Sequence, residues 1–435
     1  MQVNDKNNHT ILFIGFVWPE ITSTAASQNI ISYLKVFVAA GFNVHFASAA
    51  QLSPLSTDIS ALNVSTHQIL LNSDCFDDLV TALEPNVVVF DRFLSEEQFG
   101  WRVIKSAPKA LRILDCEDLH FLRHARHQLY KSTGYQPLNA EYLIPDATAK
   151  PKHSAIFYSD TTSREMACIY RCDLVLTLSA FEKDLLISRF NVPETNVLHL
   201  PYLLETEDPV VSIPKQEVRK DFISIGNFRH APNIDAVNVL VQHIWPAIFR
   251  ALPDTNCHIY GSYLPPKIKA LHNPKKGLHV HGHIPDHFAV LKQAKVLLAP
   301  IQFGAGVKGK IVDALRCGLP SVTTPIGTEG IEFSDWPGLQ ATDRDAFIQG
   351  AIDSYLASPD TLLQMQRNMR QILKENFDTE TNRQRLITAV ETGIANVGVN
   401  RAANFLQQLV SYHSLQTHQY MSQWIAAKNA RQQDN

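Results

Sequence analysis

The chain has 435 residues, of which 45% are hydrophobic. This length suggests two or three domains, and the apolar content suffices for more than one core. The formal net charge of -3, from 39 basic and 42 acidic residues, argues against a general nucleic-acid partner, which would need a strongly basic face.

The six cysteines contain no CxxC pair and form no dense framework, which predicts a reduced, cytoplasmic protein without disulfides. The first apolar run, 11–17, is interpreted as a buried strand rather than a secretory leader, because Pro19 and Glu20 follow it directly. No apolar run approaches the length that spans a bilayer. Any membrane contact is therefore expected to be peripheral, at the inner face of the membrane.

The first part of the chain alternates buried strands with helices. Strand 11–17, helix 29–38 and strand 44–47 form a βαβ opening, and later strands are predicted at 87–90, from Leu111, at 174–178 and at 197–200. Ligands bind at the carboxyl ends of parallel strands. Ser23 and Thr24 after the first strand, and Asp91 after the strand 87–90, are therefore candidates for an acceptor or cleft loop. For Ser23 and Thr24, a purely structural turn is an equal alternative.

Acidic side chains crowd the end of the strand that begins at Leu111. Asp115, Glu117 and Asp118 lie within four positions and are followed by His120. Like charges this close raise one another's pKa unless cations or hydrogen bonds intervene, and such crowding is more common at a functional site than on a plain surface. The alternative is a helix N-terminus with favourably placed acids and a merely exposed His120.

Prolines at 201, 209 and 214 punctuate an acidic stretch, 205–208, that lacks apolar periodicity. We predict the domain linker there, between an N-terminal domain of residues 1–205 and a C-terminal domain of residues 206–378. The second domain opens with strand 222–226, and Asn233 is predicted to cap the next helix. Histidines at 279, 281 and 283 share one face of a strand and could ligate zinc, but no cysteine lies nearby, so we expect no metal site.

The stretch 296–331 is typical of a βαβ unit with two glycine-containing loops. Gly304 and Gly306 allow backbone N–H groups to approach an anion, and the next helix points its positive end at it. Lys308 and Lys310 add two ammonium groups. Asp313, within the helix, is placed to accept hydrogen bonds from sugar hydroxyls. The pattern predicts a nucleotide or nucleotide-sugar site.

Two better-known phosphate motifs nearly fit the same residues. GxxxxGK matches 304–310 but fails at Ile311, where a P-loop needs a hydroxyl for Mg²⁺. GxGxxG matches 304–309, but a dinucleotide-binding motif also requires an acid at the end of the next strand to bind the ribose. That position here, 323–325, has the sequence Thr-Thr-Pro. A glycine-rich turn with solvated lysines is the remaining alternative.

The same stretch resembles the C-terminal half of glycosyltransferase family 4, the glycosyl transferases group 1 with the GT-B fold, and particularly a bacterial branch. Members of that branch read G-x-G-T-R-x-K-x-x-E-A and then G-x-P-V-V-x-T-x-x-G-x-E-G. The matching positions here are Gly304, Gly306, Val307, Lys308, Lys310, Asp313, Ala314, Gly318, Pro320, Val322, Thr324, Gly327, Glu329 and Gly330.

The resemblance implies an α/β protein with two Rossmann-like domains that face a cleft. Amphipathic helices are predicted at 345–356 and 361–376, and the resemblance implies a crossover helix, 379–396, that returns to the N-terminal domain. A helical tail, 397–435, extends the fold. Its segment 401–428 has apolar residues at near-helical spacing and packs on the body or contacts a protein or membrane surface, and its few cations make the membrane the less expected partner.

The resemblance also assigns roles to individual residues. In the family, the lysines hold the donor diphosphate, and the acid aligned with Asp313 holds the nucleotide ribose. The phrase 115–123 resembles D-x-x-D-L-H-x-L-R in the same branch, which makes His120 the predicted catalytic residue and Asp118 the second candidate. The predicted donor-binding set is completed by Gly226, Asn227, Arg229, Gly304, Gly306, Gly327 and Glu329.

The implied function is transfer of a sugar from a nucleotide-diphosphate donor to a glycan, a lipid-linked acceptor or a protein. The resemblance implies a retaining, metal-independent reaction in the cytoplasm, with the nucleotide-sugar as substrate and no cofactor. The broader family carries two glutamates, at the positions of Ala305 and Asp313, and the branch that this chain resembles also lacks the first. These departures leave two alternatives, a non-catalytic GT-B protein that binds a nucleotide or a partner, and a GT-B sugar-nucleotide epimerase.

Overall fold

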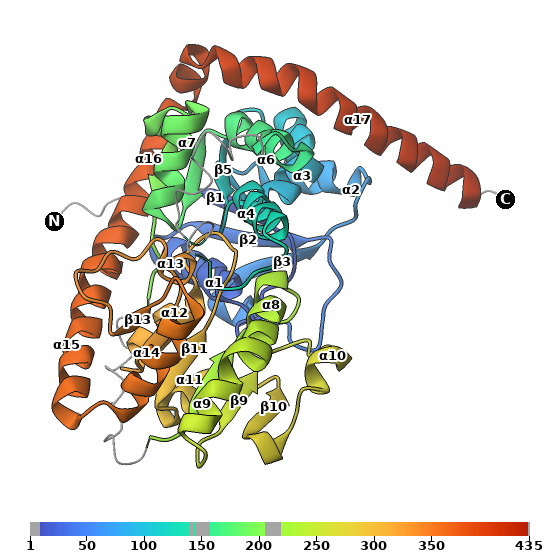
Figure 1. Cartoon of the computed structure of the whole chain (residues 1–435). Coiled ribbons are helices and arrows are strands. Elements are labelled where there is room, and N and C mark those ends of the chain that lie inside the picture. Colours follow the sequence, from blue (N-terminus) through green and yellow to red (C-terminus); the bar gives the residue numbers. More distant parts are fainter. Residues whose placement is uncertain (1–8, 140–142, 144–156, 205–218, 434–435) are drawn as a thin grey trace.

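The computed structural model describes residues 9–139, 143, 157–204 and 219–433. The chain forms two α/β domains, each built around a parallel sheet with helices on its faces, and a long helical extension (Figure 1). The predicted fold of two Rossmann-like domains is confirmed. The predicted linker at 205–208 lies outside the described residues.

The N-terminal sheet has the order β3-β2-β1-β4-β5-β6-β7, with every pairing parallel. Helices cover both of its faces, so its central strands are continuous apolar runs rather than alternating ones. The strands are β1 (Thr10–Gly15), β2 (Asn43–Ser48), β3 (Val64–Gln68), β4 (Val87–Asp91), β5 (Leu111–Asp115), β6 (Leu174–Thr177) and β7 (Val197–His199). The edge strand β3 was not predicted, because its sequence VSTHQ is largely polar.

The helix predicted at 29–38 is present as α1. Helix α1 starts four residues earlier than expected because Thr24 caps it, accepting a hydrogen bond from the backbone N–H of Ser27 at 3.1 Å. The helices are α1 (Ala25–Ala39), α2 (Cys75–Leu83), α3 (Arg92–Ser106), α4 (His120–Ser132), α6 (Asp160–Arg171) and α7 (Ala180–Phe190), with 3₁₀ turns at Ser60–Leu62 and Glu194–Asn196.

The C-terminal sheet has the order β10-β9-β8-β11-β12-β13, also with parallel pairings. Its strands are β8 (Phe222–Ile225), β9 (Cys257–Tyr260), β10 (Leu278–Gly282), β11 (Val296–Ala299), β12 (Ser321–Thr323) and β13 (Gly338–Gln340). The three-residue strand β13 was not predicted. It is too short to produce a periodic pattern.

Around this sheet, α8 (Ala231–Val239) continues through a π-helical turn, Leu240–Ile244, into α9 (Trp245–Ala251). The prediction that Asn233 caps α8 is wrong: the helix begins at Ala231, and the Asn233 amide donates to the Asn227 carbonyl instead, at 2.8 Å. The remaining elements are α10 (Pro266–Lys269), a 3₁₀ turn at Pro274–Lys276, α11 (His287–Gln293), α12 (Gly309–Arg316), α13 (Pro325–Thr328), α14 (Arg344–Leu356) and α15 (Pro359–Asn376).

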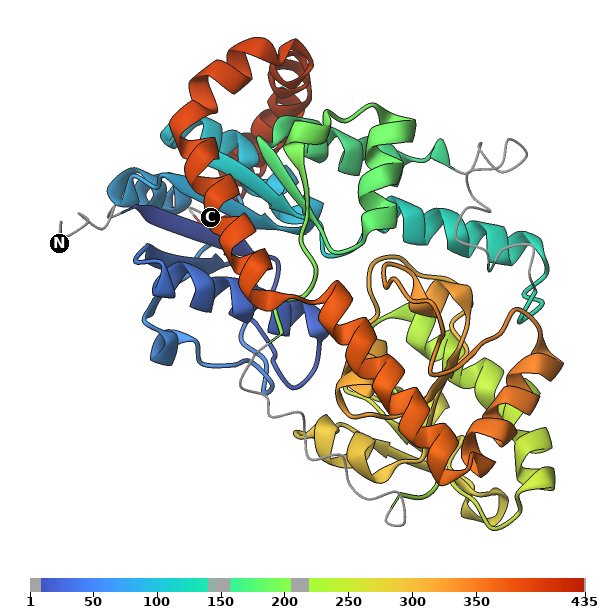
Figure 2. The same ribbon diagram turned by 90° about the vertical axis from the view of Figure 1, so that its left-hand side faces the viewer.

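A long helix, α16 (Thr379–Ala403), runs from the C-terminal domain along the N-terminal one (Figure 2). At its start the Thr379 hydroxyl donates to the Leu204 carbonyl at 2.7 Å, and further along Leu386 and Val390 are buried in the core of the N-terminal domain. It ends later than predicted. Helix α17 (Phe405–Gln433) then folds over α3 and α6. No helix in the described part of the chain is long and apolar enough to cross a bilayer.

The end of α16 is fixed by Arg401. Its guanidinium donates to both oxygens of Asp173, at 2.7 and 2.6 Å, and to the carbonyls of Pro108 and Ala110, at 2.6 Å each. Burial raises the pKa of Asp173, but the hydrogen bonds from Arg401 and the charge of Arg112 outweigh it and hold the pKa below its usual value. This bidentate pair therefore stabilises the ionised carboxylate and the docked helix together.

We expect Arg401→Ala to lower the free energy of unfolding by about 2 kcal/mol, because Asp173 then stays buried without its bidentate partner. Denaturant unfolding followed by circular dichroism measures the loss. Arg344→Ala is the control, since its pair with Asp345 is largely exposed and is expected to matter by less than about 0.5 kcal/mol. Equal midpoints for the two variants would contradict the anchoring role of Arg401.

Candidate functional site

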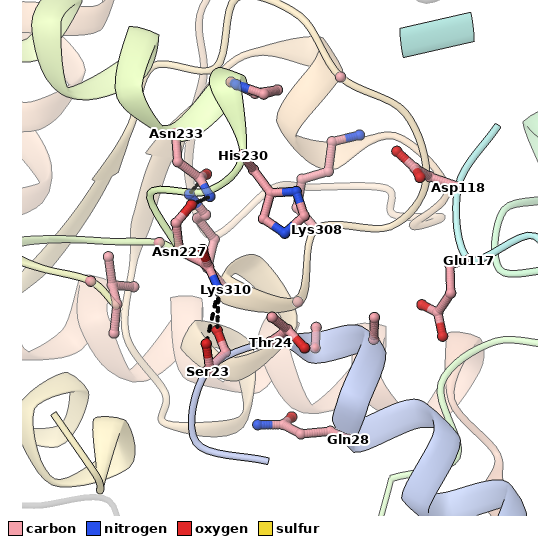
Figure 3. Close-up of a pocket in the computed structure, with 18 of the residues that line it drawn as sticks. Ser23, Thr24, Gln28, Glu117, Asp118, Asn227, His230, Asn233, Lys308 and Lys310 are labelled. Carbon is pink, nitrogen blue, oxygen red and sulfur yellow. Dashed lines mark hydrogen bonds between the residues drawn. The ribbon is translucent and has the colours of Figure 1, made fainter. Parts of the chain in front are cut away.

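A cavity of about 410 Å³ lies between the two domains, at the carboxyl ends of both sheets. Loops after β1, β4 and β5 form one wall, and loops after β8, β9, β10 and β11 form the other. The predicted site residues that line it are Ser23, Thr24, Asp118, His120, Gly226, Asn227, Gly304, Lys308, Lys310 and Asp313. The sequence thus brings together residues almost 300 positions apart (Figure 3).

The loop from Gly304 to Lys308 and the start of α12 carry the positive charge of the site. The Lys308 ammonium donates to the Gly306 carbonyl at 2.6 Å, and the Lys310 ammonium donates to the Asn233 side-chain oxygen at 2.6 Å. Burial lowers the pKa of each lysine to about 8, and for Lys310 the neighbouring charge of Lys308 contributes to the lowering. Two partly desolvated cations hold neutral oxygens here, which is the arrangement of an anion site.

Asp313 lies one turn into α12. Its Oδ2 is 3.1 Å from Nε2 of His287, and its Oδ1 accepts from Arg316 at 3.4 Å. Burial alone would lower the pKa of His287, but its hydrogen bond with Asp313 outweighs burial and raises the pKa. The carboxylate is thereby fixed in orientation at the cavity wall.

A second cavity of about 340 Å³ adjoins the first, between α1 and the segment around α11 and α12. The two cavities share lining residues, among them Ala25, Gln28 and Asp313. Asp313 therefore stands in the wall between two hollow spaces, and a ligand that contacts its carboxylate has room on either side.

The N-terminal wall carries the predicted catalytic pair. Asp118 accepts from Arg123 at 2.6 Å, and its Oδ1 lies 3.5 Å from Nε2 of His120, the first residue of α4. The Glu165 carboxylate accepts from the backbone N–H groups of His120 and Phe121, at 3.0 and 2.6 Å. Burial lowers the pKa of His120 to about 4 despite the charge of Asp118. The imidazole is therefore neutral at neutral pH and can donate or accept a hydrogen bond.

Buried polar contacts join the two walls. Arg126 of α4 donates to the Gly304 carbonyl at 2.8 Å and binds both oxygens of Glu329, at 2.8 and 2.5 Å. The Glu182 carboxylate of α7 accepts from the backbone N–H of Gly306 at 2.9 Å. Gly306 has φ of 66°, and a Cβ atom there would lie 2.8 Å from Cβ of Asp118. Glycine is thus required at 306 by both conformation and contact.

Several predicted residues lie outside the cavity lining. Glu329 is paired with Arg126. The Arg229 guanidinium stacks on the Tyr263 ring, with its Cζ 3.4 Å from the ring centroid. Asp91 accepts from the backbone N–H of Phe16 at 3.0 Å. Gly327 lies in α13, where its N–H donates to the Thr324 side chain, and Gly306 contacts the opposite wall. These side chains and glycines shape the loops that border the cavity.

The loop residues Ser23 and Asn227 meet across the cavity mouth. The Asn227 amide donates to the Ser23 hydroxyl at 2.9 Å, and Figure 3 shows this contact as a dashed line between the two domains. Thr24, by contrast, is engaged in capping α1. The structure therefore gives Ser23 an interdomain contact and Thr24 a local one.

His230 lines the cavity but was not predicted. It is the residue just before α8, and burial lowers its pKa to about 4. Figure 3 shows its ring pointing into the space near Lys308 and Asp118. Its place immediately ahead of a helix, in a loop at the carboxyl edge of the sheet, was the available signal. The prediction for that loop favoured a permanent cation and therefore fell on Arg229.

The histidines of β10 do not face this cavity as a group. Nε2 of His281 lies 2.9 Å from Nδ1 of His258 on β9. His283, just beyond β10, has its Nδ1 2.9 Å from the Ser262 hydroxyl. Among the described residues, no cluster of three or more histidine, cysteine or acidic side chains is placed to hold a metal ion.

Comparison with known proteins finds a family model that matches part of the chain. Residues 219–355 match the family model of the glycosyl transferases group 1. No curated protein sequence matches the chain significantly.

Solved structures match over most of the chain. A glycosyltransferase from Rickettsia africae is 12% identical with a TM-score of 0.61, over 89% of this chain and 98% of that chain. Sucrose-phosphate synthase from Thermosynechococcus elongatus is 15% identical with a TM-score of 0.63, over 89% and 100%. HepE from Anabaena, in complex with UDP-glucose, is 12% identical with a TM-score of 0.61, over 88% and 99%.

At these identities, the structural matches establish the fold alone. The family match covers the domain that supplies both lysines and Asp313. The resemblance inferred from the motif 304–330 is therefore confirmed: residues 219–355 match the glycosyl transferases group 1 model, and the whole chain has the fold of the matched structures.

Proposed function

We propose that this protein is a glycosyltransferase that moves a sugar from a nucleoside-diphosphate donor to an acceptor held between its domains. One observation carries the proposal: two partly buried ammonium groups, Lys308 and Lys310, lie at the N-terminus of α12 and donate hydrogen bonds to neutral oxygens. A diphosphate would bring the negative charge that this desolvated positive site is built to receive.

The donor is placed by the C-terminal domain. With the diphosphate at the lysines, Asp313 on the next turn of α12 can accept hydrogen bonds from the ribose hydroxyls. Support comes from the matched structures, since Anabaena HepE was solved with UDP-glucose and a Staphylococcus aureus TarM mutant with UDP and α-GlcNAc-glycerol.

The chemistry we propose is metal-independent and retaining. The departing diphosphate gains negative charge as the glycosidic bond breaks, and two ammonium groups with the dipole of α12 stabilise that charge in place of a divalent cation. His120, neutral through burial, is placed on the opposite wall to hydrogen-bond a hydroxyl of the donor sugar, and the anionic Asp118 beside it favours positive charge developing on the sugar.

The acceptor enters from the N-terminal wall, where Ser23 and Asp118 border the cavity. We propose a glycan, lipid-linked or protein acceptor and a reaction that needs no cofactor. The cytoplasm is the proposed location, because the six cysteines are free thiols and five of them are buried.

Lys310→Ala is expected to reduce sugar transfer at least 100-fold while leaving the thermal unfolding midpoint nearly unchanged, because it removes charge from the leaving group rather than packing from a core. Product formation from radiolabelled nucleotide-sugars, including slow donor hydrolysis without acceptor, measures the effect. Lys275→Ala, at an exposed site of the same domain, is the matched control. Near-parental turnover by Lys310→Ala would count against the proposal.

The affinity for a nucleoside diphosphate is expected to fall as pH rises above 8. The free protein must protonate both lysines, whose pKa values are about 8, whereas the bound diphosphate raises those values. Below pH 7 both lysines are already charged, and their full contribution to the affinity for the diphosphate is present. Above pH 8 the affinity falls by up to about tenfold per lysine for each pH unit. Titration calorimetry in buffers of different ionisation enthalpy should show proton uptake on binding at pH 8.

For Lys310→Ala the same titration should show about half the proton uptake, since one of the two groups is absent. A pH-independent affinity in the parent protein between pH 7 and 9.5 would show that the lysines do not contact the diphosphate.

Asp313→Asn is expected to weaken binding of a nucleoside diphosphate about tenfold, with little change in the affinity for inorganic pyrophosphate, because only the nucleoside reaches the carboxylate. Thermal-shift titration with both ligands separates the two effects, since stabilisation follows ligand concentration over affinity. Equal losses for both ligands would instead point to a disturbed α12 rather than a missing ribose contact.

A further inference from the structure

Helix α17 docks on the N-terminal domain through its polar side. The buried Gln407 amide donates to the Arg171 carbonyl at 3.1 Å and to Oδ1 of Asp173 at 2.9 Å. Further along, Arg102 of α3 donates to the buried Ser422 hydroxyl at 3.5 Å. These polar contacts fix the rotation of the helix about its own axis.

The apolar side of α17 consequently faces outward. Its exposed large side chains are Phe405 (73%), Leu406 (43%), Leu409 (43%), Tyr412 (65%), Tyr420 (64%), Met421 (58%) and Trp424 (64%). At 100° per residue, positions 405, 409, 412, 420 and 424 fall within an arc of about 120°. A surface helix normally turns such a stripe toward the core of its own domain. Here the stripe points away from it, which marks an interaction surface.

The spacing of the stripe is symmetric. Phe405 and Leu409 form an early cluster, and Tyr420 and Trp424 form a late one. Positions 405 and 424 share their midpoint with positions 409 and 420, between residues 414 and 415. A second, antiparallel copy of the helix with its two-fold axis at that midpoint would place every apolar cluster opposite another.

We propose that α17 is the interface of a homodimer, in which the helix pairs antiparallel with α17 of a second copy. Phe405 packs against Trp424 of the partner subunit, and Leu409 packs against Tyr420 of the partner subunit. Phe405 and Trp424 of one helix lie about 28 Å apart, at 1.5 Å rise per residue, so the paired region extends over most of α17.

Charge favours a second copy over a membrane. Between Phe405 and Asn429 the sequence contains Lys428 as its single formally charged residue at neutral pH. This face therefore offers no cluster of cations to an anionic lipid surface, whereas two neutral helix faces meet without like charges opposite one another.

The arrangement leaves the candidate site free. Helix α17 crosses the N-terminal domain on the side away from the C-terminal domain, and the lining of the interdomain cavity includes no residue of this helix (Figure 1). Dimerisation through α17 and ligand binding between the domains are therefore separable, and the dimer does not depend on the proposed enzymatic function.

Light scattering coupled to size exclusion tests the dimer with the full chain. We expect the parent protein to elute as a dimer and Leu409→Glu and Trp424→Glu as monomers with unchanged circular dichroism. Leu52→Glu, at a 69% exposed position outside α17, is the matched control and should remain dimeric. A monomeric parent protein, or glutamate variants that stay dimeric, would overturn the proposal.

Cysteine cross-linking tests the antiparallel register in a Cys75→Ser background, since the other five cysteines are buried. A mixture of Phe405→Cys and Trp424→Cys proteins should form a disulfide-linked dimer under mild oxidation, and either variant alone should form far less. Efficient cross-linking of either variant alone would contradict the register. Flotation of a monomeric parent protein with neutral phosphatidylcholine vesicles, abolished by Trp424→Glu, would instead identify a membrane as the partner.

Discussion

The burial of positive charge at the start of α12 is the constraint on which the rest of the site depends. An ammonium group taken out of water loses solvation that a neutral hydrogen-bond acceptor replaces only in part. Lys308 and Lys310 have such acceptors, Gly306 and Asn233, and their pKa values fall to about 8. The β11 loop that precedes α12 is held by hydrogen bonds with the N-terminal domain, and the two ammonium groups beside it are suited to binding an anion.

The contacts that hold this loop also hold the domains together. Arg126 joins α4 to Glu329 and to the Gly304 carbonyl, while Glu182 accepts from the Gly306 backbone. In both cases a buried side chain of the N-terminal domain satisfies polar groups of the glycine-rich loop, so separating the domains would leave several buried groups unpaired at once. The position of the lysines relative to His120 is therefore set by interdomain hydrogen bonds as much as by the sheets.

Much of this arrangement was predictable from local sequence. Continuous apolar runs in the sequence located the strands that carry the cavity loops, because parallel strands buried on both faces are apolar throughout. The lysines and Asp313 were predicted correctly as cavity residues because they lie within ten residues of Gly304, in one loop and the helix that follows it. Glu329 was assigned to the donor by alignment with a motif, and Arg229 as the nearby cation of its loop, but the structure joins Glu329 to Arg126, a partner 203 positions away that no local pattern reveals. His230 was missed because the prediction for its loop favoured a permanent cation, and the burial that lowers its pKa is not visible in the sequence of the loop.

Ala305 marks a departure of this chain from the broader family at the edge of the cavity. A family glutamate there would bring a carboxylate to the wall beside the lysines, whereas the Ala305 side chain is small and buried. The acids that line the described cavity are instead Asp313, fixed by His287, and Glu117 and Asp118 of the opposite domain. Burial raises the pKa of Glu117 to about 7, so its charge responds to the medium near neutrality. In the proposed function, recognition of the transferred sugar thus moves from the donor domain to the N-terminal wall, and it depends on the interdomain contacts that hold that wall in place.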